Sequence, residues 1–406
     1  MAKTPTSSAP PLTPLEQRKK SEWFAIRDHL TEWYAQPDLE CLRASLSVYQ
    51  SHFASDSPIW MFLLGPPSTG KSELCIYPLT SQEQIVQVST ITESSFISAF
   101  DPKCGILPNL NGKPKNGVLL FSDFSNFLAL TPEVRSKLQA QMREIYDGKY
   151  QKHAGNQKSA IEWEGKVSIL AACTPDLERY WTLENSLGDR FLQIRLKPPD
   201  PDSIYPYMEK QQTIGKAQLQ KKTQRLIDQF LEDVSDHPEV APPSTELNKY
   251  IFQLTNICVS LRQAVHHDFR GEATGVGTKE GTPRFARMAI NLAKTHAKIF
   301  GRTSLKPSDN RLMKRVLLDT CPSRRLHIIQ FLLNHSEPIN ITDCLAQFPG
   351  IPFTTMRRLL EDLHLLQLVT VEKVFSDRFV VLTERFRELL IDGRVDSLSY
   401  RISDNL

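Results

Sequence analysis

Short apolar runs in the first half of the chain are separated by stretches with helical periodicity. Each run is almost free of polar residues, which is typical of strands buried on both faces of a sheet. The runs cover residues 58–64, 118–121 and 167–172. Residues 131–146, between the last two runs, carry apolar positions at a helical spacing. Buried strands that alternate with helices predict a doubly wound α/β domain with a largely parallel sheet, which we expect over residues 57–200.

Helical patterns flank this domain on both sides. Upstream, Trp23, Ile26 and Leu30 recur at a helical period and predict a helical segment over residues 23–56. Downstream, the apolar runs stop and we expect a helical lid over residues 201–300. Its helical patterns cover residues 203–235, 245–268 and 282–300.

Residues 321–392 predict a separate domain. They contain three helical patterns and then two alternating stretches that a short turn joins, at residues 325–334, 341–348, 354–366, 369–375 and 378–382. Three helices and a β-hairpin in this order are typical of a winged helix. The remaining segments are expected to be a disordered tail rich in Pro, Ser and Thr, a linker and a second tail, at residues 1–22, 301–320 and 393–406.

Composition narrows the possible partners. The chain has 49 Lys and Arg against 46 Asp and Glu, so contact with nucleic acid requires a local basic surface. The seven cysteines are scattered and lack a C-x-x-C spacing, which favours reduced thiols over a disulfide framework or a zinc site. No apolar run approaches the ~18–20 residues of a membrane span, and no signal peptide is recognisable. We therefore expect a cytoplasmic protein without membrane contact.

The segment after the first apolar run has the spacing G-x-x-x-x-G-K-S. Glycines let such a loop curl so that its N–H groups face a phosphate, at the positive end of the following helix. Lys71 can then reach the β- and γ-phosphates, and Ser72 can ligate Mg²⁺. Because a buried strand precedes the loop and Glu73 opens a helical segment, we predict an ATP site formed by Gly65, Pro66, Pro67, Ser68, Thr69, Gly70, Lys71, Ser72 and Glu73.

Polar residues follow the other two apolar runs. Asp123 comes after the second run and supplies the carboxylate that an ATPase needs beside the phosphate loop. Thr174 comes after the third run and can touch the γ-phosphate or orient the attacking water. Arg190 in Gly-Asp-Arg-Phe and Arg284 in Thr-Pro-Arg-Phe follow later in the chain.

In this order and spacing the chain resembles the AAA+ ATPases, in which Walker B, sensor 1, an arginine finger and sensor 2 follow the P-loop. The resemblance covers roughly residues 57–300 and is most specific for the branch of the minichromosome maintenance helicases and the enhancer-binding activators. Three segments carry the resemblance. Residues 141–155 resemble a helix that leads into a β-hairpin before sensor 1. Residues 188–191 resemble an Arg-Phe finger, and residues 282–298 resemble a sensor 2 helix. Residues 143–148 also resemble a segment of ATPases from phages and integrative elements.

The resemblance implies a role for each of these residues. Asp123 corresponds to Walker B, Thr174 to sensor 1, Arg190 to the arginine finger and Arg284 to sensor 2, with Arg287 as a competitor. An arginine finger neutralises charge on the transferring phosphoryl group and comes from outside the loop that binds it. In AAA+ proteins the adjacent subunit supplies it, so the resemblance implies a homo-oligomeric ring, commonly a hexamer.

Two positions depart from the family pattern. Ser122-Asp123-Phe124 stands where the helicases carry Asp-Glu before Phe, so Asp123 serves either as the general base or as the Mg²⁺ ligand. A shorter carboxylate lies about one methylene farther from the water, which catalytic geometry tolerates poorly. Thr174 replaces the usual Asn of sensor 1. Slow hydrolysis, or a switch held by bound nucleotide, is therefore an open alternative.

A basic segment coincides with the hairpin that the resemblance implies. Lys149, Lys152 and Lys158 lie there together with Tyr150 and His153. In the helicases this hairpin projects into the pore of the ring and grips single-stranded DNA. Cations follow phosphates and aromatic faces accept bases, so the composition suits that role. The alternative is an ordinary solvated, charged turn.

The winged helix provides a second candidate surface for nucleic acid. Arg357 and Arg358 lie on its third helix, and Lys373 in its wing can contact phosphates. Glu361 and Asp362 on the same helix balance the two arginines. Many winged helices dock proteins, so a protein partner is the alternative.

These expectations combine into one leading hypothesis. The chain is a cytoplasmic AAA+ ATPase that uses ATP and Mg²⁺ and forms a ring on DNA, as a helicase-like translocase or replication factor of a mobile element. An ATP-switched DNA-binding regulator or loader with slow hydrolysis is the first alternative. A protein-remodelling AAA+ ATPase is the second.

Overall fold

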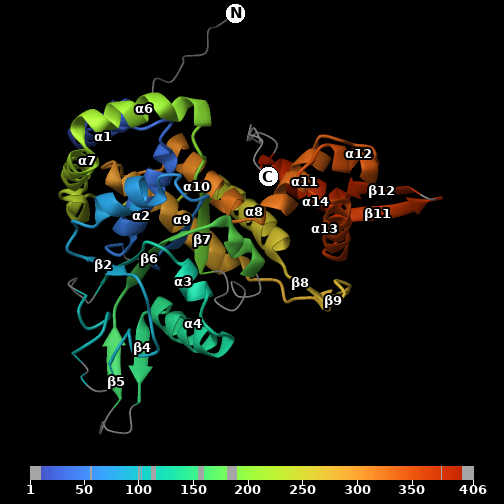
Figure 1. Ribbon diagram of the computed structural model, residues 1–406, viewed down its shortest axis with the longest axis horizontal. Helices are drawn as coiled ribbons and strands as arrows, with labels where there is room; N and C mark the ends of the chain where they lie inside the picture. The colour runs from blue at the N-terminus through green and yellow to red at the C-terminus, as the bar shows by residue number, and fades with distance from the viewer. Residues whose placement is uncertain are drawn as a thin grey trace, which may run out of the picture.

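A computed structural model describes residues 11–54, 57–98, 101, 103–110, 116–153, 160–180, 190–375 and 377–395. A five-stranded parallel sheet, flanked by helices, forms its centre (Figure 1). The strand order is β2-β3-β6-β1-β7. The strands are β1 (Trp60–Leu64), β2 (Ile85–Val88), β3 (Gly117–Phe121), β6 (Val167–Cys173) and β7 (Phe191–Arg195).

The three apolar runs are confirmed as buried parallel strands. They form β1, β3 and β6, and every residue of these strands is buried. β1 lies between β6 and β7, with Trp60 opposite Ile169 on one side and Phe191 on the other. Because all the strands are parallel, the carboxyl ends of β1, β6 and β3 lie together at one edge of the sheet.

The amino-terminal helices belong to the core. They are α1 (Pro14–Trp33) and α2 (Leu39–Ser51), and α2 packs against β6. α1 begins inside the disordered tail that was expected over residues 1–22, and this expectation is wrong from residue 14 onward. A capping box between Thr13 and Glu16 starts the helix. The buried Lys19 then anchors it, because its Nζ donates to the Phe230 carbonyl oxygen at 2.8 Å.

A helix and a hairpin separate β3 from β6. After the short α3 (Ser125–Leu128), α4 (Pro132–Tyr146) leads into the antiparallel pair β4 (Lys149–Lys152) and β5 (Ile161–Glu164). The helix predicted at residues 131–146 is confirmed. The hairpin projects from the body of the molecule, below the sheet in Figure 1.

The helices expected in the lid are present with two corrections. They are α6 (Pro201–Ile214), α7 (Lys216–Leu231), α8 (Thr245–Arg262) and α9 (Thr282–Ile299). The pattern at 203–235 forms two helices because Gly215, with φ of 88°, interrupts it. The pattern at 245–268 stays helical only to Arg262, and β8 (Val265–His267) then pairs with β9 (Ala273–Val276).

The expectation of a linker at residues 301–320 is also wrong. Most of it forms α10 (Pro307–Asp319), which packs against β7 and α9. Arg315 on this helix is buried and makes a bidentate ion pair with Asp38, which caps α2. Long-range packing therefore makes this segment part of the core.

The carboxyl-terminal domain contains the three predicted helices and the predicted hairpin, together with a short strand, β10 (Ile339–Asn340), and a last helix, α14 (Glu384–Asp392), that were not predicted. The predicted elements are α11 (Ser323–Leu333), α12 (Ile341–Ala346), α13 (Phe353–Leu365), β11 (Val369–Val374) and β12 (Asp377–Leu382). Its antiparallel sheet has the order β10-β12-β11. The domain lies at one end of the molecule, where α14 packs against α8 (Figure 1). Within the described part of the chain, every helix is too short or too polar to cross a membrane.

Candidate nucleotide site

The loop of residues 65–72 leaves β1 at the carboxyl edge of the sheet. Gly65 is buried, and its N–H donates to the Cys173 carbonyl oxygen of β6 at 3.3 Å. A Cβ atom on Gly65 would lie 2.9 Å from the hydroxyl oxygen of Thr69. Gly70 has φ of 84°, in the left-handed region that favours glycine. The path of the backbone therefore requires glycine at Gly70, whereas a side chain at Gly65 would have to displace the Thr69 hydroxyl.

Lys71 folds back across this loop. Its Nζ donates to the carbonyl oxygens of Gly65 at 2.5 Å and Pro66 at 2.6 Å. Burial lowers the pKa of the Lys71 ammonium, while the nearby Cys173 and Asp123 oppose that shift. The ammonium therefore lies over the loop, where it can exchange these carbonyls for phosphate oxygens.

The helix after the loop is shorter than the sequence predicts. Residues Lys71–Ile76 form a π-helical turn, and Tyr77–Leu79 continue as a 3₁₀ turn. Pro78 lacks an N–H group, so a regular α-helix cannot continue through it without losing a hydrogen bond. Glu73 in this turn accepts from the Tyr34 hydroxyl at 3.4 Å and pairs with Lys216 at 3.5 Å. These contacts join the loop to α1 and α7.

The structure brings Asp123 and Thr174 to the same edge as Lys71. Asp123 lies two residues beyond β3, and Thr174 directly follows β6. The N–H of Phe124 donates to the Ala172 carbonyl oxygen at 2.8 Å, which holds the end of β3 beside the end of β6. Asp123 is exposed, and its Oδ1 accepts from the Ser125 N–H at 2.8 Å.

The donor set at this edge fits Mg²⁺ bound together with a nucleotide. Ser72 and Asp123 are both exposed and supply one hydroxyl and one carboxylate. Mg²⁺ binds through one or two such groups and otherwise uses phosphate oxygens and water. Among the described residues, no three His, Cys, Asp or Glu side chains gather to hold a metal by themselves.

Arg190 lies at the opposite edge of the sheet. It directly precedes β7, whose first residue pairs with Trp60, so about 20 Å of strand separates it from Gly65. Its side chain is buried, with 6% of the residue exposed. The guanidinium lies 3.5 Å from the Asp147 carboxylate and 5.3 Å from the centre of the Tyr146 ring. Arg190 is therefore remote from the loop of residues 65–72 of its own chain.

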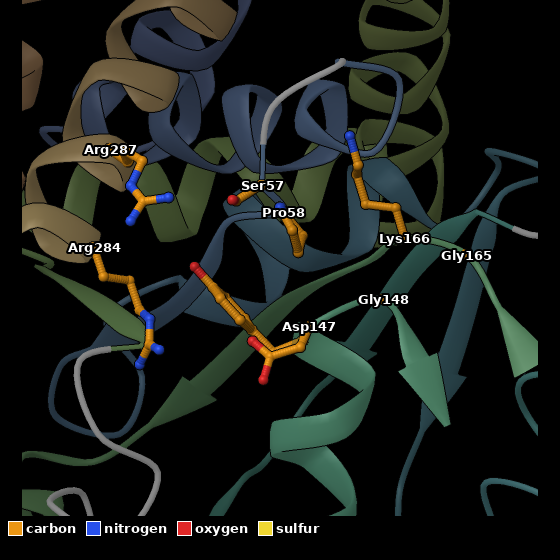
Figure 2. Close-up of a pocket in the computed structure, with 9 residues that line it drawn as sticks. Ser57, Pro58, Asp147, Gly148, Gly165, Lys166, Arg284 and Arg287 are labelled. Atoms are coloured by element: carbon orange, nitrogen blue, oxygen red, sulfur yellow. The ribbon is translucent and has the colours of Figure 1, made fainter. Parts of the chain in front are cut away.

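Arg284 and Arg287 also lie at this opposite edge. They come from the first turns of α9 and line a pocket of about 400 Å³ together with Asp147 and Lys166. Figure 2 shows both guanidinium groups reaching toward the pocket from α9, across from Asp147. The pocket also includes Ser57, just before β1. Arg284 thus lies apart from Lys71, and Asp147, which lines the same pocket, pairs with Arg190.

Sequence reasoning missed the acidic and basic partners in this pocket. Asp147 and Gly148 follow α4, and Lys166 precedes β6, so they belong to segments that meet only in the folded chain. The sequence signal in these segments was the dipeptide Asp147-Gly148, which follows a predicted helix. That signal indicates a turn and says nothing about a neighbouring arginine.

The hairpin residues expected to contact DNA have different environments. Lys149 is exposed, whereas Lys152 is partly buried and its Nζ donates to the Ile97 carbonyl oxygen at 2.9 Å. Tyr150 is only 4% exposed and lies opposite Trp163, so its ring packs in the core instead of offering a face to a base. Lys158 lies outside the described residues.

The basic residues of α13 are largely engaged within the protein. Arg357 pairs with Glu361 at 3.0 Å, and Arg358 donates to the Arg270 carbonyl oxygen, in the turn between β8 and β9, at 3.2 Å. Lys373 on β11 is exposed. Asp362, which was expected to balance the two arginines, is buried.

Asp362 joins the lid to the carboxyl-terminal domain. Its carboxylate accepts from His267 Nε2 at 2.9 Å and from Arg325 Nη2 at 3.0 Å. Sequence reasoning missed this joint because the segment around His267 was expected to be helical.

No protein-family model matches the chain, and no curated protein matches it either.

Proposed function

We propose that this chain is an ATPase of the AAA+ type that acts in the cytoplasm. The observation that carries the proposal is the loop of residues 65–72, which places Lys71 at the same edge of the sheet as Asp123 and Thr174. In this proposal Lys71 neutralises the β- and γ-phosphates. Ser72 and Asp123 hold Mg²⁺, which would neutralise phosphate charge, and Thr174 orients the attacking water.

We further propose that the active form is a homo-oligomeric ring, commonly a hexamer in the family. Arg190 and Arg284 lie at the sheet edge opposite their own phosphate loop. A head-to-tail interface brings opposite faces of neighbouring subunits together, and it forms a ring when the rotation between subunits closes. In such a ring these arginines would stabilise charge on the nucleotide of the next subunit, as an arginine finger does.

The proposed substrate of the motor is DNA, with single-stranded DNA in the pore of the ring. The exposed Lys149, and the projection of its hairpin from the body of the molecule, support this part of the proposal (Figure 1). Such a protein would be a helicase-like translocase or a replication factor of a mobile element. The exposed Lys373 and the winged-helix order of elements supply a second DNA contact or a docking site for a protein.

A second candidate function is an ATP-switched DNA-binding regulator or loader. Asp123 favours it, because the segment after β3 offers one short carboxylate where the helicases carry two. One carboxylate cannot both ligate Mg²⁺ directly and deprotonate the attacking water. Hydrolysis would then be slow, and bound ATP would hold one conformation.

Steady-state ATP hydrolysis, with and without single-stranded DNA, tests these proposals. For the motor we expect stimulation by DNA that is lost in Lys71→Ala and in Lys149→Ala, since Lys149 is the exposed lysine of the hairpin. Lys221→Ala is the matched control, since Lys221 is an exposed lysine on α7. Thermal melting checks that Lys149→Ala still folds.

Three results would redirect the proposal. Tight ATP binding with negligible turnover would overturn the motor and leave the switch. A rate of ATP hydrolysis that does not change when DNA is added would favour a protein-remodelling ATPase. Failure to bind ATP at all would overturn the assignment of residues 65–72 as a nucleotide site.

A further inference from the structure

A large groove lies where the carboxyl-terminal domain meets the rest of the molecule. It has a volume of about 990 Å³ and is lined mainly by α8, α10 and the end of α14. α8 packs against both α10 and α14, so the groove follows the junction of three packed helices (Figure 1). The described lining includes none of residues 65–73 and no residue of β4 or β5. The groove is therefore separate from the candidate nucleotide site and from the basic hairpin.

Two helices each present one stripe of side chains to this groove. The α8 stripe is Glu246, Lys249 and Gln253, and the α10 stripe is Asn310, Arg311 and Lys314. Residues three or four positions apart lie on the same face of a helix. Each helix therefore lines the groove with one face, and both faces are polar and charged.

Cations outnumber carboxylates in this groove. Six cationic and three acidic side chains line it, namely Lys197, Lys249, Arg311, Lys314, Arg315 and Arg394 against Glu40, Glu246 and Asp392. Arg315 is buried, and the carboxylates of Asp38 and Glu40 hold it. Five cations and two carboxylates remain when Arg315 and Glu40 are set aside. In a chain of nearly balanced charge, this is the kind of local basic surface that contact with nucleic acid requires.

Lys249 and Arg311 are accessible to a ligand. Both residues are exposed, and neither makes an ion pair within the described part of the chain. They belong to different helices, α8 and α10, yet they line the same groove. Lys197 and Arg394 are exposed as well. Cations gathered in one groove repel one another, and a bound polyanion replaces this repulsion with attraction.

Contacts within the protein hold the end of α14 against this groove. Lys314 Nζ donates to the Arg394 carbonyl oxygen, and Gln253 Nε2 donates to the Asp392 carboxylate at 2.8 Å. The Arg394 guanidinium lies 5.8 Å from the centre of the Tyr250 ring, which also lines the groove. Arg394 is therefore positioned before a ligand arrives, and such preorganisation lowers the entropic cost of binding.

We propose that this groove binds the phosphate backbone of single-stranded DNA. The inference rests on the action on DNA proposed above, and it adds a contact at the junction of the lid, α10 and the carboxyl-terminal domain. Lys249, Arg311 and Arg394 would contact successive phosphates through charge-assisted hydrogen bonds. Among the described lining residues, the apolar side chains are Leu247, Pro307 and Tyr250. A peptide in a groove usually inserts apolar side chains, so this polar lining favours a DNA strand over an acidic peptide.

Fluorescence anisotropy with labelled oligo(dT) tests this site in the full-length chain. The double variant Lys249→Gln/Arg311→Gln should bind about tenfold more weakly than the unmodified chain, because two charge-assisted contacts to phosphate are lost. Its plot of log affinity against log salt concentration should be shallower by about 1.4, since each phosphate contact with a single strand contributes about 0.7 to the slope. The matched control is Lys221→Gln/Arg225→Gln, which removes an exposed Lys and Arg of α7 outside the groove and should change neither quantity.

The possible failures are distinguishable. If the unmodified chain does not bind oligo(dT), the action on DNA and this groove are both rejected. If the double variant melts at the parental temperature and keeps the parental affinity and salt slope, the groove alone is rejected. Equally strong binding of polyglutamate would assign the groove to an acidic peptide instead. As a second measurement, Lys249→Glu should weaken binding more than Lys249→Gln, because the reversed charge repels phosphate, and equal affinities would also contradict the proposal.

Discussion

Gly70 adopts a backbone conformation that L side chains rarely tolerate. Its φ is 84°, and a Cβ atom there would lie 3.0 Å from Cδ1 of Leu74. We expect Gly70→Ala to strain the loop by about 1–2 kcal/mol and to weaken ATP binding, because Lys71 and Ser72 follow directly. The measurement is the Kd of a fluorescent ATP analogue, together with the melting temperature.

Gly281→Ala provides the matched control for this substitution. Gly281 precedes α9 with φ of −79°, and a Cβ atom there would meet only Pro283, at 3.9 Å. We expect its nucleotide affinity to equal that of the unmodified chain. Equal affinity in Gly70→Ala would contradict the conformation assigned to the loop.

Asp38 and Arg315 form a buried ion pair whose strength depends on pH. Nη1 and Nη2 of Arg315 lie 2.7 Å and 2.6 Å from the two carboxylate oxygens. Burial alone would raise the pKa of Asp38, but the hydrogen bonds and charge of Arg315 outweigh it and lower the pKa. A carboxyl group with a lowered folded-state pKa adds stability above its unfolded pKa, and that stability is lost as the pH falls through the folded value.

We therefore expect the free energy of unfolding to fall below about pH 4. Asp38→Asn should make this decline smaller and should cost about 1–3 kcal/mol at pH 7, because Arg315 loses its bidentate partner but still pairs with Glu40 and Asp319. Urea unfolding at pH 7 and pH 3 measures both effects. Asp28→Asn, at an exposed carboxylate on α1, should change neither. An unaltered pH dependence in Asp38→Asn would show that other groups control the acid transition.

At the scale of elements, the β8–β9 hairpin and α13 form one joint. His267 and Arg325 both donate to the buried Asp362, and the Arg358 guanidinium lies against the turn of the hairpin. The lid and the carboxyl-terminal domain are therefore connected through polar contacts. If the proposed ATP site moves the lid, these contacts would transmit that movement to α13.

Neighbouring carboxylates on α13 provide an internal test of this joint. Asp362→Ala should lower the free energy of unfolding by about 3–5 kcal/mol, because it leaves Arg325 buried without its partner. Glu361→Ala should cost about 1 kcal/mol or less, since Glu361 is exposed and pairs with Arg357 and Arg378 at the surface. Urea unfolding measures both values, and equal costs would contradict the role assigned to Asp362.

At the scale of the whole molecule, the candidate site divides between two edges of the sheet. Lys71 lies at the carboxyl edge and Arg284 at the amino edge. If the arginines act on a neighbouring subunit, an interface is complete when one subunit supplies the loop and the other supplies the arginine. A complete interface can therefore form between a chain that lacks a working loop and a chain that lacks the arginine.

Mixing two inactive variants tests this division. Lys71→Ala and Arg284→Ala should each abolish ATP hydrolysis, and an equal mixture of reassembled rings should recover about a quarter of the parental activity. That fraction corresponds to interfaces that pair an intact loop with an intact arginine. The control mixes Lys71→Ala with Ser72→Ala, both in the loop, and should stay inactive. No recovery in the first mixture would contradict action between subunits.

Sequence patterns predicted the central strands and most helices because their signals are local. The runs at 58–64, 118–121 and 167–172 became β1, β3 and β6, since a buried strand requires a continuous apolar segment. The same reasoning failed at residues 263–268 and over the linker at 301–320. There the conformation depends on partners far along the chain, such as Asp362 for His267 and Asp38 for Arg315.

The sequence by itself determined the parallel α/β sheet, most helices of the lid, three helices and the hairpin of the last domain, and the glycine-rich loop at residues 65–72. Each depends on residues close together in the chain, where periodicity and glycine conformation act. Only the tertiary structure decided which charged groups meet. It placed Arg190 and Arg284 about Asp147, and Lys249 and Arg311 along one groove, because strand order and helix packing bring together segments that are far apart in sequence.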